Sequence, residues 1–183
     1  FGTLFALLTP PFAAPDEPAH FLRSIELAKG VLFERPYLPA DLKTFIESSF
    51  GFSFSDEQVR QEKLKTLHSL SDKMLAEKSP LIEFPINRAI IYTPVVYMPS
   101  VLAHWISNAA GLSVIENLYL ARLFSMFAGC LLLYAAIRII PVLKWPIAFL
   151  FLFPAAIHIR SSVSADTMAN SMILLFFAAV LYY

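Results

Sequence analysis

The chain has 183 residues, of which 57% are hydrophobic and 15% are charged, and its mean hydropathy is +0.63. Soluble domains are normally about a quarter charged, so this composition favours a membrane protein. The formal net charge is zero, which argues against a nucleic-acid-binding protein, and the single Cys130 excludes an intramolecular disulfide framework.

Apolar sequence stands at both ends of the chain, and we therefore expect a fragment of a longer membrane protein. Residues 1–9 lack the basic flank and cleavage site of a signal peptide, so they are interpreted as the end of a first transmembrane helix. A spanning helix needs about 20 apolar residues. The later apolar stretches are 94–112, 118–137, 145–159 and 168–183.

These stretches differ in how well they fit a membrane span. Residues 118–137 have the required length, whereas 145–159 is short. Residues 94–112 contain Pro99 and His104, which favours a helix that lies on the membrane or re-enters it over one that crosses.

The polar region 10–117 is predicted to be a large extracytoplasmic loop. An amphipathic helix is expected over 14–30, with its polar face towards water or a cavity, because Asp16 suits its N-cap and Gly30 suits its end. Its apolar stripe is Phe21, Ile25, Ala28 and Leu32. A charged helix is expected over 55–78, packed by the stripe Leu64, Leu67, Leu70 and Met74.

Basic residues indicate the sidedness of the remaining segment, 118–183. Arg138 and Lys144 predict that the connection 138–144 is a short cytoplasmic turn, which makes 160–167 a second outer loop. The two outer loops lie on the same side of the membrane only if 94–112 does not cross it.

Asp16, Glu17 and His20 lie within one turn of the first predicted helix and share a face. One interpretation is structural: Asp16 caps the helix, Glu17 complements its dipole, and His20 is an exposed polar residue. The other is functional, because ionisable groups beside hydrocarbon are costly. A metalloprotease is less well supported, since Glu-x-x-His is half of a ligand set.

The stretch "PPFAAPDEPAHFLRSIELAKG" closely resembles the opening motif of the DUF2142 family of predicted bacterial membrane proteins, which are similar to the GT-C glycosyltransferases. Looser matches are "YTPVVYMPSVLAHW", "NLYLARLFSM" and the acid Asp166. The resemblance implies an all-α, multi-spanning fold in the bacterial cell membrane. It has a GT-C-like N-terminal part, with amphipathic membrane-lying helices and an acidic residue in the first outer loop. It also implies a second acid in the next outer loop, where Asp166 lies.

The implied function is transfer of a sugar from a polyprenyl-phosphate-linked donor to a cell-surface glycan or lipid acceptor at the outer face of the membrane, among membrane lipids. In this interpretation Asp16 is the base, Glu17 orients the acceptor or a metal, and His20 supports either. The divalent cation, Mg²⁺ or Mn²⁺, would bind Asp16 and Asp166. The substrate-binding candidates are Arg122 for the phosphate, Arg160 in reserve, and Tyr92 and Tyr97 with Trp105 along a groove.

Each of these roles has an alternative. Asp166 also suits the N-cap of the following helix, the arginines suit snorkelling anchors, and the tyrosines suit interfacial aromatics. The whole protein is alternatively a non-catalytic membrane protein for polysaccharide assembly or export that binds lipid-linked glycan, or a structural segment with no site of its own.

Overall fold

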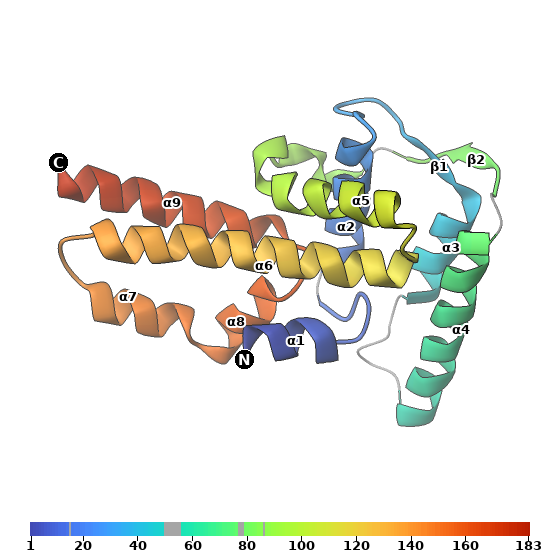
Figure 1. Cartoon of the computed structure of the whole chain (residues 1–183), viewed down its shortest axis with the longest axis horizontal. Coiled ribbons are helices and arrows are strands. Elements are labelled where there is room, and N and C mark those ends of the chain that lie inside the picture. The colour runs from blue at the N-terminus through green and yellow to red at the C-terminus, as the bar shows by residue number, and fades with distance from the viewer. Residues whose placement is uncertain (15, 50–55, 77–78, 86) are drawn as a thin grey trace.

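Helices of residues 114–183, together with residues 2–8, form one end of the molecule, the helical end, and the helices and two short strands of residues 17–110 form the other (Figure 1). The structure is a computed structural model that describes residues 1–14, 16–49, 56–76, 79–85 and 87–183. The helical end contains α6 (Val114–Ile139) packed against α9 (Ala165–Tyr182), with α7 (Lys144–Phe151), α8 (Pro154–Arg160) and α1 (Gly2–Leu8) on the other side of α6.

The opposite end carries most of the region predicted as an outer loop. Its helices are α2 (Glu17–Ala28), α3 (Ala40–Ser49), α4 (Glu57–Ala76) and α5 (Met98–Ala110), with the short turns η2 (Arg88–Ile91) and η3 (Pro94–Tyr97). Strands β1 (Tyr37–Pro39) and β2 (Leu81–Glu83) pair antiparallel, with Leu38 opposite Ile82. The chain is therefore mostly helical but not strictly all-α. These three-residue strands are too short to leave a period-2 pattern in the sequence.

Two of the described helices, α6 and α9, are long and apolar enough to cross a membrane. A capping box starts α6, because Ser113 Oγ accepts from Glu116 N while the Glu116 carboxylate accepts from Ser113 N. In contrast, α5 has 13 residues and ends at Gly111 with φ 65°. At 1.5 Å per residue it is about 20 Å long, which is too short to cross a hydrocarbon core of roughly 30 Å alone.

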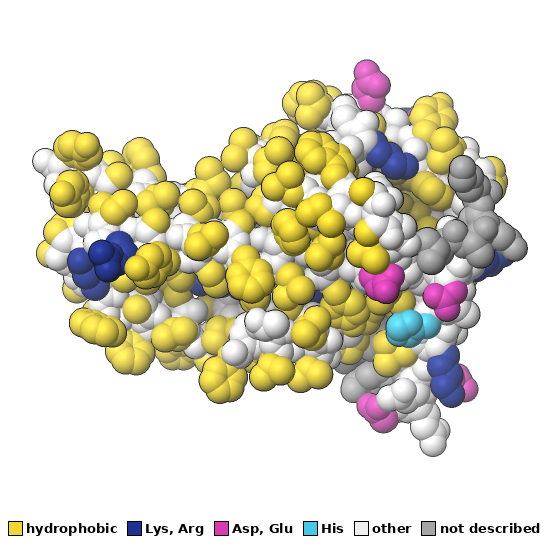
Figure 2. Space-filling model, viewed as in Figure 1, with side chains coloured by type: hydrophobic (Ala, Val, Ile, Leu, Met, Phe, Trp, Pro, Cys, Tyr) yellow, Lys and Arg dark blue, Asp and Glu magenta, His cyan; other side chains and the backbone are white. Residues whose placement is uncertain are grey.

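Hydrophobic side chains cover most of the visible surface of the helical end (Figure 2). A group of Lys and Arg side chains interrupts this surface at the end where α6 connects to α7. Arg138 and Lys144 are both exposed in this connection. Charged side chains of both signs appear instead around the opposite end (Figure 2).

The apolar stretch 145–159 does not form one continuous helix. The chain forms α7 and α8, separated at Leu152 and Phe153. Pro154 has no N–H group, and it holds the preceding Phe153 in an extended conformation with φ −60° and ψ 139°. The helix therefore ends and restarts, with Pro154 in the first turn of α8.

The two amphipathic helices of the outer region differ in how they match the predictions. In α4 the stripe is confirmed: Leu67 is buried, and Leu64, Leu70 and Met74 pack around the same core. Residues 55, 77 and 78 of this predicted helix lie outside the described residues. In α2 the polar face does not point towards water, because most of its polar and charged side chains are buried. Leu32, predicted to belong to the apolar stripe, lies beyond the helix end and is exposed.

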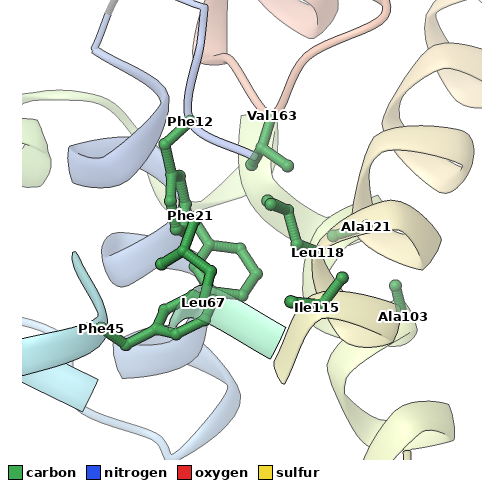
Figure 3. Close-up of a cluster of buried hydrophobic side chains, with 9 residues drawn as sticks. All are labelled: Phe12, Phe21, Phe45, Leu67, Ala103, Ile115, Leu118, Ala121 and Val163. Carbon is green, nitrogen blue, oxygen red and sulfur yellow. The ribbon is translucent and has the colours of Figure 1, made fainter. Parts of the chain in front are cut away.

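A hydrophobic cluster joins the outer region to the long helices (Figure 3). In it, Phe12 packs on Phe21 and Phe45, with ring centroids 5.5 and 5.8 Å apart. Its nine residues come from the helices α2 to α6, from the loop before α2 and from the loop before α9. They are Phe12, Phe21, Phe45, Leu67, Ala103, Ile115, Leu118, Ala121 and Val163. The cluster therefore holds the start of α2 against α6 and against the loop that leads into α9.

Candidate functional site

The centre of the site is a buried ion pair between α2 and α6. The side chains of Glu17 and Arg122 both have 0% of their surface exposed. Arg122 Nε donates to Glu17 Oε1 at 2.7 Å, and Arg122 Nη2 donates to Glu17 Oε2 at 2.6 Å. A bidentate pair of this kind is both strong and geometrically specific. It fixes the first residue of α2 on α6.

The remaining N–H groups of Arg122 bind the backbone where α1 ends. Nη1 donates to the carbonyls of Ala6 at 3.0 Å and Thr9 at 2.6 Å, and Nη2 donates to the carbonyl of Pro10 at 2.9 Å. Helix ends leave carbonyls without intrahelical partners, and Arg122 supplies donors to them. All five N–H groups of the guanidinium are thus in use. In this structure none is left for the phosphate that the sequence analysis assigned to Arg122.

Glu17 also binds the segment that precedes α9. Val163 N donates to Glu17 Oε1 at 3.0 Å, although the two residues are 146 positions apart in the chain. Asp16 directly precedes Glu17, and Asp166 follows Val163 in the first turn of α9. One carboxylate therefore holds together the two chain segments that carry the predicted acids.

Asp16 and Asp166 are exposed, and neither carboxylate accepts a hydrogen bond from a residue that the structure describes. Asp16 occupies the N-cap position of α2 with φ 57°, but its side chain makes no capping hydrogen bond. Ser164, not Asp166, caps α9, because Ser164 Oγ accepts from Asp166 N at 3.1 Å. Capping therefore explains neither acid, and no described residue occupies either carboxylate, so both are available to a ligand.

His20 lies beside these acids and is paired with a tyrosine. Its Nδ1 lies 2.7 Å from Tyr97 Oη, and its ring packs edge-on against Tyr92 with centroids 5.4 Å apart. Burial lowers the pKa of His20, while the negative charges of Asp166, Asp16 and Glu17 oppose that shift. The negative charges of three carboxylates therefore favour the protonated form of the same imidazole.

The tyrosine determines which nitrogen of His20 carries the proton. Tyr97 is 1% exposed, and burial raises the pKa of its phenol, so the hydroxyl keeps its proton. His20 Nδ1 is the partner of Tyr97 Oη among the described residues. If His20 Nδ1 donated, the buried phenol O–H would lack an acceptor at a cost of about 1–3 kcal/mol. Tyr97 therefore donates, and the neutral His20 carries its proton on Nε2.

The described residues contain no group of three or more His, Cys, Asp or Glu side chains placed to hold a metal ion. A dedicated all-protein metal cage is therefore absent from this part of the chain. Two free carboxylates fit a different arrangement, since Mg²⁺ is usually bound by one or two carboxylates and completed by waters and substrate phosphates.

Of the predicted site residues, Arg160 is not brought to this cluster. It lies at the end of α8 and lines a cavity against α1, α6 and α7. Tyr92 and Tyr97 do lie at the site, but through contacts with His20. Trp105 is half exposed and donates from Nε1 to the carbonyl of Ala28. His68 is exposed on α4.

A buried polar chain beside the site was missed by the sequence analysis. Ser24 Oγ lies 2.7 Å from His104 Nε2, and His104 Nδ1 lies 2.7 Å from Asn117 Oδ1. Burial lowers the pKa of His104 to about 4. Ser24 has no exposed surface, so no substrate can reach it. The chain acts by fixing α2 and α5 on α6. The available signal was the spacing of four between His20 and Ser24, which extends the polar face of α2.

A second buried ion pair lies farther along α2. Arg23 Nη1 donates to Glu26 Oε2 at 3.0 Å, and Arg23 Nη2 donates to the carbonyl of Leu32 at 2.7 Å. Arg23 and Glu26 are three residues apart, a spacing that allows an ion pair on one helix face. This spacing does not show whether the two side chains are buried. Together with Glu17 and Ser24, this pair accounts for the polar face of α2 turning into the protein.

Comparison with protein families gives a match over the whole chain. The model of the family described as "Predicted membrane protein (DUF2142)" covers residues 1–183. Neither a curated protein nor a solved structure matches the chain.

Proposed function

The chain belongs to the DUF2142 family of predicted membrane proteins, and from this membership we propose that it is a GT-C-like glycosyltransferase of the bacterial cell membrane. It transfers a sugar from a polyprenyl-phosphate-linked donor to a cell-surface glycan or lipid acceptor at the outer face. The observation that carries the proposal is the pair of unpartnered carboxylates, Asp16 and Asp166, on segments that Glu17 joins through Val163 N.

Sugar transfer needs a base for the acceptor hydroxyl. In the proposal, Asp16 takes the proton as the acceptor oxygen bonds to the anomeric carbon. The bond between that carbon and the donor phosphate oxygen breaks, and its electron pair leaves with the polyprenyl phosphate. A free, exposed carboxylate suits this role, whereas Glu17 has both oxygens engaged.

The leaving phosphate needs positive charge or hydrogen-bond donors. Asp166, with the second oxygen of Asp16, is suited to hold Mg²⁺ or Mn²⁺, which would neutralise the phosphate charge. His20 adds a neutral donor, because its proton is on Nε2 when Tyr97 donates to Nδ1. Glu17 and Arg122 serve as positioning residues that hold the segments bearing the two acids.

The test is transfer activity of the full-length protein in proteoliposomes, with a radiolabelled polyprenyl-phosphate sugar. Asp16→Asn is the sharpest variant, because asparagine also tolerates the left-handed conformation at this position. Loss of a general base lowers the rate by about 10²–10⁴-fold. Asp166→Asn is expected to lower the rate and to weaken its dependence on divalent cation. The matched control is Glu47→Gln, an exposed carboxylate on α3. Full activity in a folded Asp16→Asn protein would contradict the proposal.

A non-catalytic protein that binds lipid-linked glycan for assembly or export is the second candidate. One observation favours it: all five N–H groups of Arg122 donate to acceptors within the protein, so this guanidinium has no donor left for a phosphate. The same variants separate the two candidates. A binding protein shows no turnover in the wild type and binds lipid-linked glycan equally well after Asp16→Asn.

A further inference from the structure

Arg160 is a buried cation without a counter-ion in the described part of the chain. Only 7% of its surface is exposed, and its Nη2 is buried without a hydrogen-bond partner. The ion pairs and hydrogen bonds of the described residues do not include its guanidinium. A buried and unpaired charge is strongly destabilising, and inside a membrane protein such a group marks a ligand site by default.

The surroundings of Arg160 indicate the kind of ligand. It lines a cavity of about 360 Å³ between α1, α6, α7 and α8. The other lining residues are apolar and include Met126 and Leu133 of α6, Phe151 of α7 and Ile157 of α8. One cation in an otherwise apolar cavity complements a molecule with an anionic head and an apolar tail.

An aromatic ring orients the guanidinium for such a ligand. The Arg160 guanidinium carbon lies 4.2 Å from the centroid of the Phe151 ring. This cation–π contact covers one side of the guanidinium. The N–H groups along the edge of a guanidinium match phosphate oxygens in a fork.

The position of Arg160 also matches a lipid head group. Directly after it, Ser161 and Ser162 begin the polar loop that leads into α9. Before it, α7 and the break that follows expose Phe149, Leu150 and Phe153 on the outer surface. Arg160 therefore lies between an exposed apolar surface and a buried serine-rich segment, and in the proposal below this junction lies at the level of bilayer phosphates.

We propose that Arg160 binds the head-group phosphate of an anionic phospholipid from the surrounding bilayer, with part of an acyl chain in the cavity. This site is separate from the acids. The cavity is lined by one face of α6, which carries Met126 and Leu133. Tyr97, the partner of His20 at the acidic site, packs against other α6 residues, Ala128 and Leu132. The proposal is therefore independent of the proposed glycosyltransferase activity.

The experiment compares the full-length wild-type protein with Arg160→Met in nanodiscs of phosphatidylcholine, with and without phosphatidylglycerol. Thermal unfolding and native mass spectrometry of retained lipid are the readouts. The wild type should retain phosphatidylglycerol and unfold at a higher temperature in its presence. Arg160→Met should lose that rise and bind phosphatidylglycerol about tenfold more weakly or worse, because a charged hydrogen bond is lost. The control Arg138→Met removes an exposed arginine and should behave as the wild type.

The phosphatidylcholine arm gives a test that does not depend on the ligand. If Arg160 has no counter-ion in the protein, relief of its unpaired charge offsets the lost contact with the Phe151 ring, and the unfolding temperature of Arg160→Met stays unchanged or rises. A lower unfolding temperature there would show that the Arg160 charge is stabilised within the protein and would overturn the proposal. So would an equal response of Arg160→Met to phosphatidylglycerol, or equal stabilisation of the wild type by inorganic phosphate alone.

Discussion

The substitution Glu17→Gln tests whether the buried ion pair with Arg122 holds the site together. The amide has the size of the carboxylate but no charge. With its oxygen at the Oε1 position, it still accepts from Arg122 Nε and Val163 N, which lie at 2.7 and 3.0 Å. Its NH₂ group then faces Arg122 Nη2, which donates at 2.6 Å in the wild type. In the reverse orientation the NH₂ group takes the Oε1 position, where it faces two donors, Arg122 Nε and Val163 N.

Either orientation leaves Arg122 as a buried cation with only carbonyl and amide acceptors. Removing one partner of a buried ion pair costs about 3–5 kcal/mol. This is a large part of the roughly 5–15 kcal/mol by which domains are stable. For chains of 150–250 residues each kcal/mol lowers the unfolding temperature by about 2–4 °C. We therefore expect a decrease of about 6–20 °C.

The assay is thermal unfolding of the full-length protein in one detergent and at one scan rate. The matched control is Glu47→Gln, whose carboxylate is 61% exposed and lies 3.9 Å from Lys43. An exposed pair of this kind contributes at most about 1 kcal/mol, so the control should unfold close to the wild type. Equal unfolding temperatures for Glu17→Gln and Glu47→Gln would refute the reasoning.

Two further predictions concern the packing of helices around the site. Burial lowers the pKa of His104 to about 4, so the unfolded chain binds this proton more readily, and stability should fall from about pH 6.5 to pH 4. Denaturant unfolding at several pH values should show a smaller fall in His104→Gln. Gly129→Ala should destabilise by about 1–3 kcal/mol, because its Cβ would lie 2.7 Å from Thr167 Cγ2. Thr167→Ser in the same chain removes that methyl group and should restore part of the unfolding temperature, whereas no restoration would contradict the clash.

Local patterns account for the elements that the sequence predicted correctly. The apolar length of 118–137 identified α6, and the stripe through Leu67 identified the packed face of α4. The break between α7 and α8 was also present in the sequence, because Pro154 cannot continue a helix, but the apolar composition of 145–159 concealed it.

The candidate site was only partly predictable. The acidic turn was recognised from its position beside apolar sequence, and Asp16, Glu17 and His20 do lie together. Their separate roles were not predictable, because an acid at a helix start has the same local sequence whether it caps, pairs or stays free. The structure separates them: Glu17 pairs with Arg122, whereas the Asp16 carboxylate has no hydrogen-bond partner among the described residues.

By itself, the sequence determined that the chain is a mostly helical membrane protein, where its main helices lie, and which acids deserve attention. It could do so because hydrophobic period, apolar length and helix-start residues act within a few turns of one helix. Only the tertiary structure decided that Glu17 meets Arg122 and Val163, across 105 and 146 residues, and that Arg160 has no counter-ion in the described part of the chain. Such partners depend on how helices distant in sequence pack against one another, and a local pattern carries no information on that packing.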